Sequence, residues 1–324
     1  MVAPGMGNLV APALGNMVAL TQSTVGNCRG PRHAAVPNVS RNIHSERREA
    51  LQIKYFKSTW GMTESSIDDK LKRISEAGYD GVEAGAPDER REREEMAALL
   101  SKYHLLFIGQ QWTSGRSLEE HKSSFERQFN NNMELNPVQI NSHTGKDYYT
   151  KTQNVELIKY CNMLAADRGI KLTHETHRGR FSFCASSTAE VIGEMPELRL
   201  TADFSHWCCV SESMLEDQSD LLERIYPHCD HLHARIGHEE GPQVSDPKAP
   251  EWKYAEAKHL EWWTRIVQGH EEKRDAMFPI TVEFGPPNYM VTIPFSKMPV
   301  TDLWEANLYM REMLKTKLIA GNHK

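Results

Sequence analysis

The chain has 324 residues, which is enough for one large α/β domain with a sizeable buried core. Its formal net charge of −6 and its pI of about 6.2 give no overall electrostatic reason to expect binding to nucleic acid. A mean hydropathy of −0.59 and the lack of any long uncharged apolar run exclude a transmembrane helix. We therefore expect a small-molecule partner, with neither nucleic acid nor a membrane as a partner.

The N-terminal residues differ in composition from the rest of the chain. They are rich in Gly, Pro, Ala, Asn and Val, contain no Asp or Glu before Glu46, and gain positive charge from Arg29, Arg32 and Arg41. An acid-free, arginine-bearing segment is typical of an organelle transit peptide, and a disordered extension without a targeting role has a similar composition. We expect residues 1–48 to form a disordered or targeting extension and residues 49–324 to form one folded domain.

The six cysteines include no C-x-x-C pair, and the adjacent Cys208 and Cys209 are poorly placed to bridge each other. This pattern favours reduced thiols over a disulfide framework. We therefore expect an intracellular protein, cytoplasmic or mitochondrial.

From about residue 53, short apolar segments alternate with longer charged segments of helical period. The predicted strands are "IKYFKSTWG" (53–61), "YDGVEAG" (79–85), "LLFIGQQW" (105–112), "PVQINSHTG" (137–145), "IKLTHETH" (170–177), "LRLTADFSHW" (198–207), "CDHLHARIG" (229–237) and "ITVEFGP" (280–286). Helical patterns between them cover residues 65–78, 92–103 and 152–169, and several predicted helices end in glycine or a polar residue just before the next strand.

Eight β segments, each followed by a helix, predict a parallel sheet. Eight such units over about 270 residues favour a closed (β/α)8 TIM barrel. The alternative, an open doubly wound sheet, would call for a glycine-rich phosphate loop after the first strand. The stretch "STWGMTESS" after that strand contains a single glycine, which disfavours the open sheet.

Polar residues stand at the ends of seven predicted strands, where the catalytic groups of a TIM barrel lie. They are Glu83, Gln110, Gln111, Asn141, His143, Glu175, His177, Asp203, His206, His231, His233, Arg235 and Glu283. Buried carboxylates and imidazoles are costly unless they are paired or bound to a cation. Four consecutive strands that end in this way therefore favour a metal site over four separate structural hydrogen bonds.

Alternation along the strands selects the side chains that point into the barrel. On this basis Thr201 and Asp203 share the inner face, and Leu200 and Ala202 face the helices. Between His231 and His233 we prefer His233 as a ligand because it lies nearer the strand end. The resulting set that converges on the barrel mouth is Glu175, Asp203, His233 and Glu283. Three carboxylates and one imidazole favour one divalent ion, Mn²⁺ first, with Mg²⁺, Co²⁺ or Zn²⁺ as alternatives.

The stretches "HETHRGR", "ADFSHW", "HLHAR" and "VEFGP", in this order, resemble the xylose isomerase-like superfamily of sugar phosphate isomerases and epimerases, over about residues 53–315. In the ketose 3-epimerase branch of that superfamily, a glutamate, an aspartate, a histidine and a second glutamate hold one divalent ion. The resemblance implies these roles for Glu175, Asp203, His233 and Glu283. It also suggests, by analogy, a possible homodimer.

The resemblance further implies substrate contacts for His206, three residues after the aspartate, and for Arg235. Arg235 follows His233 by two residues, a shorter gap than in the epimerases, and "ETHRGR" stands where they have Glu-x-x-Asn. The other candidate substrate-binding residues are His177, His143, Arg178 and Trp112.

These residues predict a divalent-metal-dependent isomerase or epimerase acting on a sugar or a sugar-like ketone or polyol. Glu175 and Glu283 are the expected catalytic pair, one removing a proton beside a metal-bound carbonyl and the other returning it. The alternatives are a dehydratase or lyase acting on a related hydroxy-ketone and, with less support, a phosphodiesterase or a non-catalytic barrel.

Overall fold

The computed structural model describes residues 51–273 and 275–320. The N-terminal extension expected over residues 1–48 lies outside the described residues. The eight strands are β1 Gln52–Ser58, β2 Gly81–Ala84, β3 Leu106–Trp112, β4 Gln139–His143, β5 Leu172–Glu175, β6 Leu200–Ala202, β7 Cys229–Ala234 and β8 Met277–Val282. Each lies within or overlaps its predicted segment.

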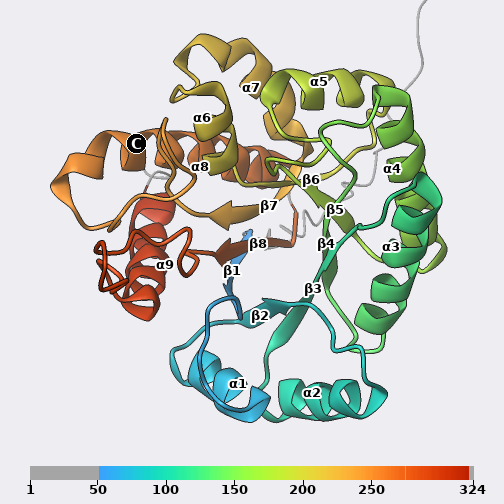
Figure 1. The fold of residues 1–324 in the computed structure, drawn as a ribbon, viewed down its shortest axis with the longest axis horizontal. Coiled ribbons are helices and arrows are strands. Elements are labelled where there is room, and N and C mark those ends of the chain that lie inside the picture. The colour runs from blue at the N-terminus through green and yellow to red at the C-terminus, as the bar shows by residue number, and fades with distance from the viewer. Residues whose placement is uncertain (1–50, 274, 321–324) are drawn as a thin grey trace, which may run out of the picture. The chain divides into compact units, whose positions relative to one another are not determined.

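The strands form a closed, fully parallel barrel in the order β1 to β8, with β8 paired to β1 (Figure 1). The predicted TIM barrel is therefore confirmed. In the register between β7 and β8, His233 lies beside Thr281. The register between β6 and β7 shifts at Leu200 and Thr201, which places Thr201 beside His231.

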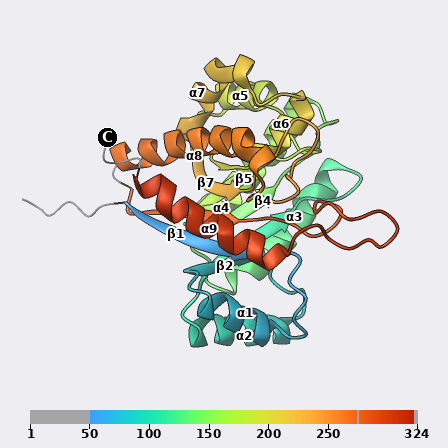
Figure 2. The same ribbon diagram turned by 90° about the vertical axis from the view of Figure 1, so that its left-hand side faces the viewer.

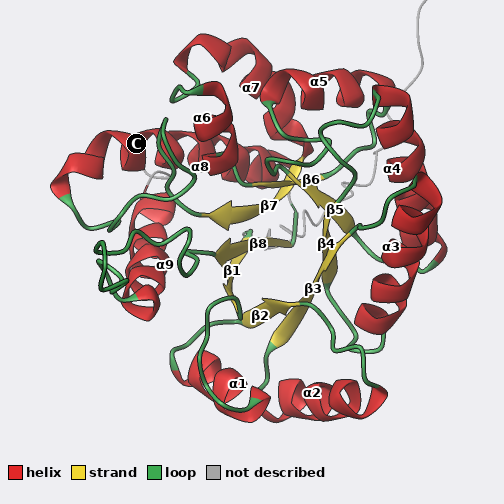
Figure 3. Ribbon diagram, in the orientation of Figure 1, coloured by secondary structure: helices red, strands yellow, loops and turns green. Residues whose placement is uncertain are grey.

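Helices surround the barrel on its outside (Figure 3). They are α1 Ile67–Glu76, α2 Arg90–Lys102, α3 Leu118–Met133, α4 Lys151–Asp167, α5 Ala185–Glu194, α6 Ser205–Ser211, α7 Ser219–Ile225, α8 Lys253–Lys273 and α9 Leu303–Ala320. Short 3-10 turns lie at Glu216–Gln218, Tyr226–His228 and Pro250–Trp252. The segment between β8 and α9 projects beyond the strand ends (Figure 2). None of the described helices is both long and apolar enough to cross a membrane.

Local sequence signals account for several helix ends. Thr150 caps α4 by accepting a hydrogen bond from the Gln153 backbone, and the Gln153 side chain accepts one from the Thr150 backbone. Ser66 caps α1 in the same position, and Gly169 follows α4 with a φ of 63°, a conformation that costs glycine little.

The hydrophobic core lies between the sheet and the helices. The outward side chains of the strands, among them Leu200, Ala202, Leu232, Ala234 and Val282, pack in it as alternation predicts. The inner face is polar instead: Thr173 Oγ1 lies 2.7 Å from Thr201 Oγ1. Packing and chemistry therefore occupy opposite faces of the same strands. The five described cysteines, Cys161, Cys184, Cys208, Cys209 and Cys229, are free thiols.

Candidate active site

The four predicted metal ligands meet at the C-terminal mouth of the barrel. Glu175 is the last residue of β5, and His233 lies in β7. Asp203 directly follows β6, and Glu283 directly follows β8. One ligand atom of each residue lies within 4.8 Å of the others, and all four side chains are buried.

The ring of His233 is oriented by Glu83 of β2. Nε2 of His233 lies 3.0 Å from both carboxylate oxygens of Glu83. Nδ1 faces the other way, 3.0 Å from Glu283 Oε2 and 3.4 Å from Glu175 Oε2, and makes no hydrogen bond within the described residues. A carboxylate that accepts from one ring nitrogen leaves the lone pair of the other nitrogen available to a metal. Glu83 therefore favours the tautomer in which Nδ1 is the ligand atom.

Glu83 is itself held by a dense set of donors. Asn141 Nδ2 donates to it over 2.9 Å and Thr281 Oγ1 over 2.5 Å. Burial alone would raise the pKa of Glu83, but the neighbouring His233 and His231 lower it to about 2. His231 lies one step deeper in the barrel, with its Nε2 3.6 Å from Glu83 Oε2. Glu83 therefore stays ionised.

Two ligand atoms lack partners in a way that suits a cation. Glu175 Oε2 accepts from Asn141 over 2.9 Å and lies 2.7 Å from His143 Nε2. Its Oε1 is buried without a hydrogen-bond partner among the described residues, as is Nδ1 of His233. Leaving such atoms unpaired is costly, and a divalent ion held by the four ligands would satisfy both. The residues therefore fit one divalent metal ion with mostly oxygen ligands.

Arg235 enters the ligand group itself. Its Nη2 forms an ion pair with Asp203 Oδ2 and lies 2.9 Å from His206 Nε2. Its Nη1 lies 3.7 Å from Glu283 Oε2, and its side chain is only 1% exposed. Burial raises the pKa of Asp203 to about 6 against the opposing effect of Arg235. Arg235 thus supplies a fixed positive charge among the buried carboxylates, in addition to lining the adjoining cavity.

Three histidines form a row above the ligands. The His177 ring lies 4.8 Å from that of His143 and 3.9 Å from that of His206. Burial lowers the pKa of His177 to about 3 and that of His206 well below its usual range. His177 and His206 are therefore neutral imidazoles. His177 lines the cavity described next and can hydrogen-bond a substrate hydroxyl without adding charge, whereas His206 is fully buried and does not line that cavity.

A cavity of about 330 Å³ opens above this group. Of the predicted substrate-binding residues, His143, His177, Arg235 and Trp112 line it, and Trp60 and Tyr289 complete its aromatic wall. Arg178 is exposed and lies at the rim, with its guanidinium 5.1 Å from the centre of the Tyr289 ring.

Four of the site residues described above were absent from the predicted set: Glu83, Asn141, Trp60 and Tyr289. Glu83 and Asn141 carried a usable signal, since both are polar residues at strand ends. Tyr289 carried none, because it lies in the irregular segment after β8 and reaches the cavity only through the fold.

The profile of the xylose isomerase-like TIM barrel family matches residues 71–240, more than half of the chain. The chain belongs to the xylose isomerase-like TIM barrel family. No protein of curated function matches it significantly.

Several solved structures share the fold of this xylose isomerase-like barrel. A D-allulose 3-epimerase from Methylomonas sp. has a TM-score of 0.58 at 12% identity, over 82% of this chain and 98% of the epimerase. A probable 3-DHS dehydratase from Bacillus anthracis has a TM-score of 0.55 at 16% identity, over 82% of this chain and 99% of the dehydratase. Endonuclease IV from Thermus thermophilus has a TM-score of 0.54 at 13% identity, over 82% of this chain and 99% of the endonuclease. At these identities the likeness establishes the fold alone.

Proposed function

We propose that the protein is a divalent-metal-dependent isomerase or epimerase acting on a sugar or a sugar-like ketone. The observation that carries the proposal is the meeting of Glu175 and Glu283, from β5 and β8, on one cavity and in one ligand group. The preferred ion is Mn²⁺, and Mg²⁺ suits the same oxygen-rich set.

When bound, the ion would polarise a substrate carbonyl and its neighbouring hydroxyl and so acidify the adjacent C–H bond. One of Glu175 and Glu283 removes that proton, and the other returns a proton to the opposite face, which inverts the carbon. If the proton is returned to the neighbouring carbon instead, the reaction is a 1,2-isomerisation. His177 holds a substrate hydroxyl, His206 supports Arg235 from behind the cavity wall, and the walls of Trp60, Trp112 and Tyr289 exclude water.

A dehydratase is the second candidate, favoured by the place of Arg235. Its guanidinium lies among the ligands and on the cavity, where it would pair with a substrate carboxylate. In that reaction a glutamate removes the C–H proton and passes it to the departing hydroxyl, which leaves as water and gives a double bond. Ultraviolet absorbance of the conjugated product separates this outcome from epimerisation.

A phosphodiesterase would need more than one metal ion, and a further group of side chains beside the four ligands could hold a second ion. His143, Glu175 and His177 each offer an atom within 4.8 Å of the others. We rank this reading lower because the chain is acidic overall. Elemental mass spectrometry on protein purified without chelators tests it, since about one ion per chain supports the proposal and two or three zinc ions support the phosphodiesterase.

The decisive assay is deuterium exchange from solvent into ketoses and keto-polyols, with Mn²⁺, Mg²⁺ or Co²⁺ supplied. Glu283→Gln should abolish exchange and leave the fold intact, while Glu92→Gln on the exposed face of α2 should have no effect. Exchange that persists in Glu283→Gln contradicts the two-glutamate scheme. A protein that takes up none of these ions supports a non-catalytic barrel.

A further inference from the structure

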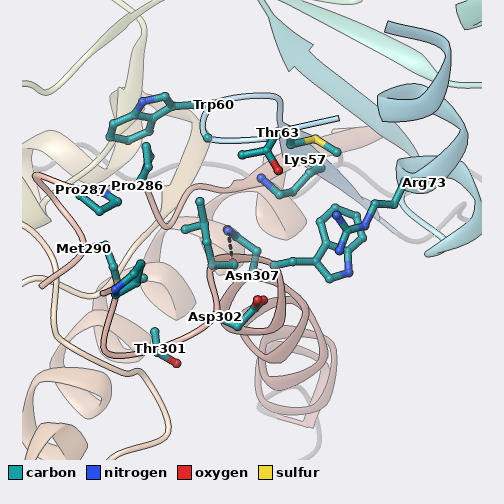
Figure 4. Close-up of a pocket in the computed structure, with 15 residues that line it drawn as sticks. Lys57, Trp60, Thr63, Arg73, Pro286, Pro287, Met290, Thr301, Asp302 and Asn307 are labelled. Atoms are coloured by element: carbon teal, nitrogen blue, oxygen red, sulfur yellow. Dashed lines mark hydrogen bonds between the residues drawn. The ribbon is translucent and has the colours of Figure 1, made fainter. Parts of the chain in front are cut away.

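A second cavity, of about 300 Å³, lies next to the active site and shares the Trp60 wall with it. It is bounded by the β1–α1 loop, the segment between β8 and α9, and the start of α9 (Figure 4). Its lining is mostly apolar and includes Trp60, Met290, Leu303 and Trp304.

Lys57 is one of three charged residues in this lining, together with Arg73 and Asp302. It is the penultimate residue of β1, its side chain is 1% exposed, and it projects into the space near Trp60 and Asn307 (Figure 4). Its Nζ donates to the Ser58 carbonyl over 2.5 Å. Among residues 51–273 and 275–320, no carboxylate lies within 4.0 Å of it. An ammonium carries three donors, so Lys57 is a buried charge with most of its hydrogen-bonding capacity unused.

The other charges around the cavity are already engaged. Arg73 forms an ion pair with Glu64 and lies 3.9 Å above the Trp304 ring. Asp302 is exposed and accepts from the Glu305 backbone over 2.8 Å, at the start of α9. Within the described part of the chain, Lys57 is therefore the charge that the cavity leaves without a counterion.

We propose that this cavity binds a small organic anion, with a carboxylate beside Lys57 Nζ and an apolar body against Trp60, Met290 and Leu303. A buried ammonium without a counterion is costly, and an anionic ligand removes that cost. Burial, against the attraction of Glu283 and Glu64, lowers the pKa of Lys57 to about 8, so the side chain remains protonated at neutral pH. The volume suits a ligand at the small end of the usual range.

Trp60 connects the ligand to the active site. A Cβ on Gly285 would lie 2.2 Å from the indole, so the ring packs directly on that backbone. The indole also meets the Tyr289 ring edge to face, with the two ring centroids 4.9 Å apart. The centroid of the Tyr289 ring lies in turn 4.8 Å from the Arg235 guanidinium carbon. Tryptophan fluorescence should therefore report occupation, since both Trp60 and Trp304 line the cavity, and the site adjoins the catalytic cavity whatever reaction occurs there.

The test titrates the full chain with benzoate at neutral pH, followed by calorimetry and tryptophan fluorescence, with benzamide as the neutral probe of the same shape. We expect benzoate to bind with a Kd in the millimolar range, since it has few atoms. Benzamide should bind about tenfold more weakly or not at all, because it lacks the charge-assisted contact.

Lys57→Met should reduce benzoate binding to the level of benzamide, and Lys54→Met on the same strand should leave it unchanged. Equal binding of benzoate and benzamide to the unmodified chain would overturn the proposal without reliance on any variant. So would benzoate binding that survives Lys57→Met, which would place the anion elsewhere, for example at Arg235. Absence of saturable binding by both benzoate and acetate would also overturn it.

Discussion

Replacing Lys57 by methionine should stabilise the folded chain at neutral pH. Burial, partly offset by Glu283 and Glu64, lowers the pKa of Lys57 from its ordinary value of 10.5 to about 8. Since one pKa unit corresponds to about 1.4 kcal/mol, the charged side chain costs the fold roughly 3 kcal/mol. Methionine keeps most of the apolar stem but loses the hydrogen bond to the Ser58 carbonyl, worth about 1 kcal/mol. The expected net gain is roughly 2 kcal/mol.

This gain should depend on pH in a defined direction. The unfolded chain keeps the Lys57 proton up to pH 10.5, and the folded chain keeps it only up to about 8. The stability of the unmodified protein therefore rises with pH across this window, because the unfolded state binds more protons there. Methionine binds none, so its advantage should be largest below about pH 8 and should fall as the pH rises to 10.5. Above that pH only the lost hydrogen bond to the Ser58 carbonyl remains, and Lys57→Met should be about 1 kcal/mol less stable than the unmodified protein.

Urea unfolding of both proteins, in buffers free of organic anions, measures the difference across this pH range. Lys54→Met is the matched control: Lys54 lies on the same strand, is 31% exposed and pairs with Asp80 at 3.0 Å. Its loss should cost at most about 1 kcal/mol. A destabilised Lys57→Met protein at neutral pH, or a difference that stays constant with pH, would refute the reasoning that Lys57 is a buried charge without a counterion.

Three further predictions concern the metal centre and a helix cap. Glu83→Ala should weaken divalent-ion binding by about 10- to 100-fold in calorimetry, because His233 loses its orienting carboxylate, and Glu92→Gln should not. Removing the ion with EDTA should lower Tm, and resupply at about 100 times the Kd should restore about 2.7 kcal/mol; an unchanged Tm would argue against the site. Thr150→Ala should cost about 1 kcal/mol in urea unfolding, whereas the exposed Thr152→Ala should cost little.

Much of this architecture can be predicted from the sequence because it follows from two periodicities, the two-residue alternation of strands and the helical period of the segments between them. Strand alternation predicted that Leu200 and Ala202 face the helices and that Asp203 lies inside the barrel, and the structure confirms that placement. The positions of polar residues at strand ends predicted which side chains meet, since parallel strands deliver their carboxyl ends to one mouth. The convergence of the four ligands within 4.8 Å is the geometric consequence of that rule.

The remaining features depend on distances that no local pattern encodes. The sequence places Arg235 two residues after His233, just beyond the end of β7, but its ion pair with Asp203 depends on how β6 and β7 register. The orienting role of Glu83 depends on contact across the barrel, from β2 to β7. Tyr289 reaches the cavity from an irregular segment, where neither period applies.

The contrast between the two faces of the strands also explains why Lys57 stands out. Inner side chains such as Glu83 and Thr281 are polar and satisfy one another, while outer ones such as Ile280 and Val282 are apolar and pack against helices. Lys57 lies outside the ligand group and lines a mostly apolar cavity, yet it carries a charge. A charge in an apolar layer is costly to the fold, so its presence is best explained by a ligand that offsets the cost when bound. The stabilisation expected of Lys57→Met and its loss of anion binding therefore have the same cause, the buried charge of Lys57. The two effects should appear together or not at all.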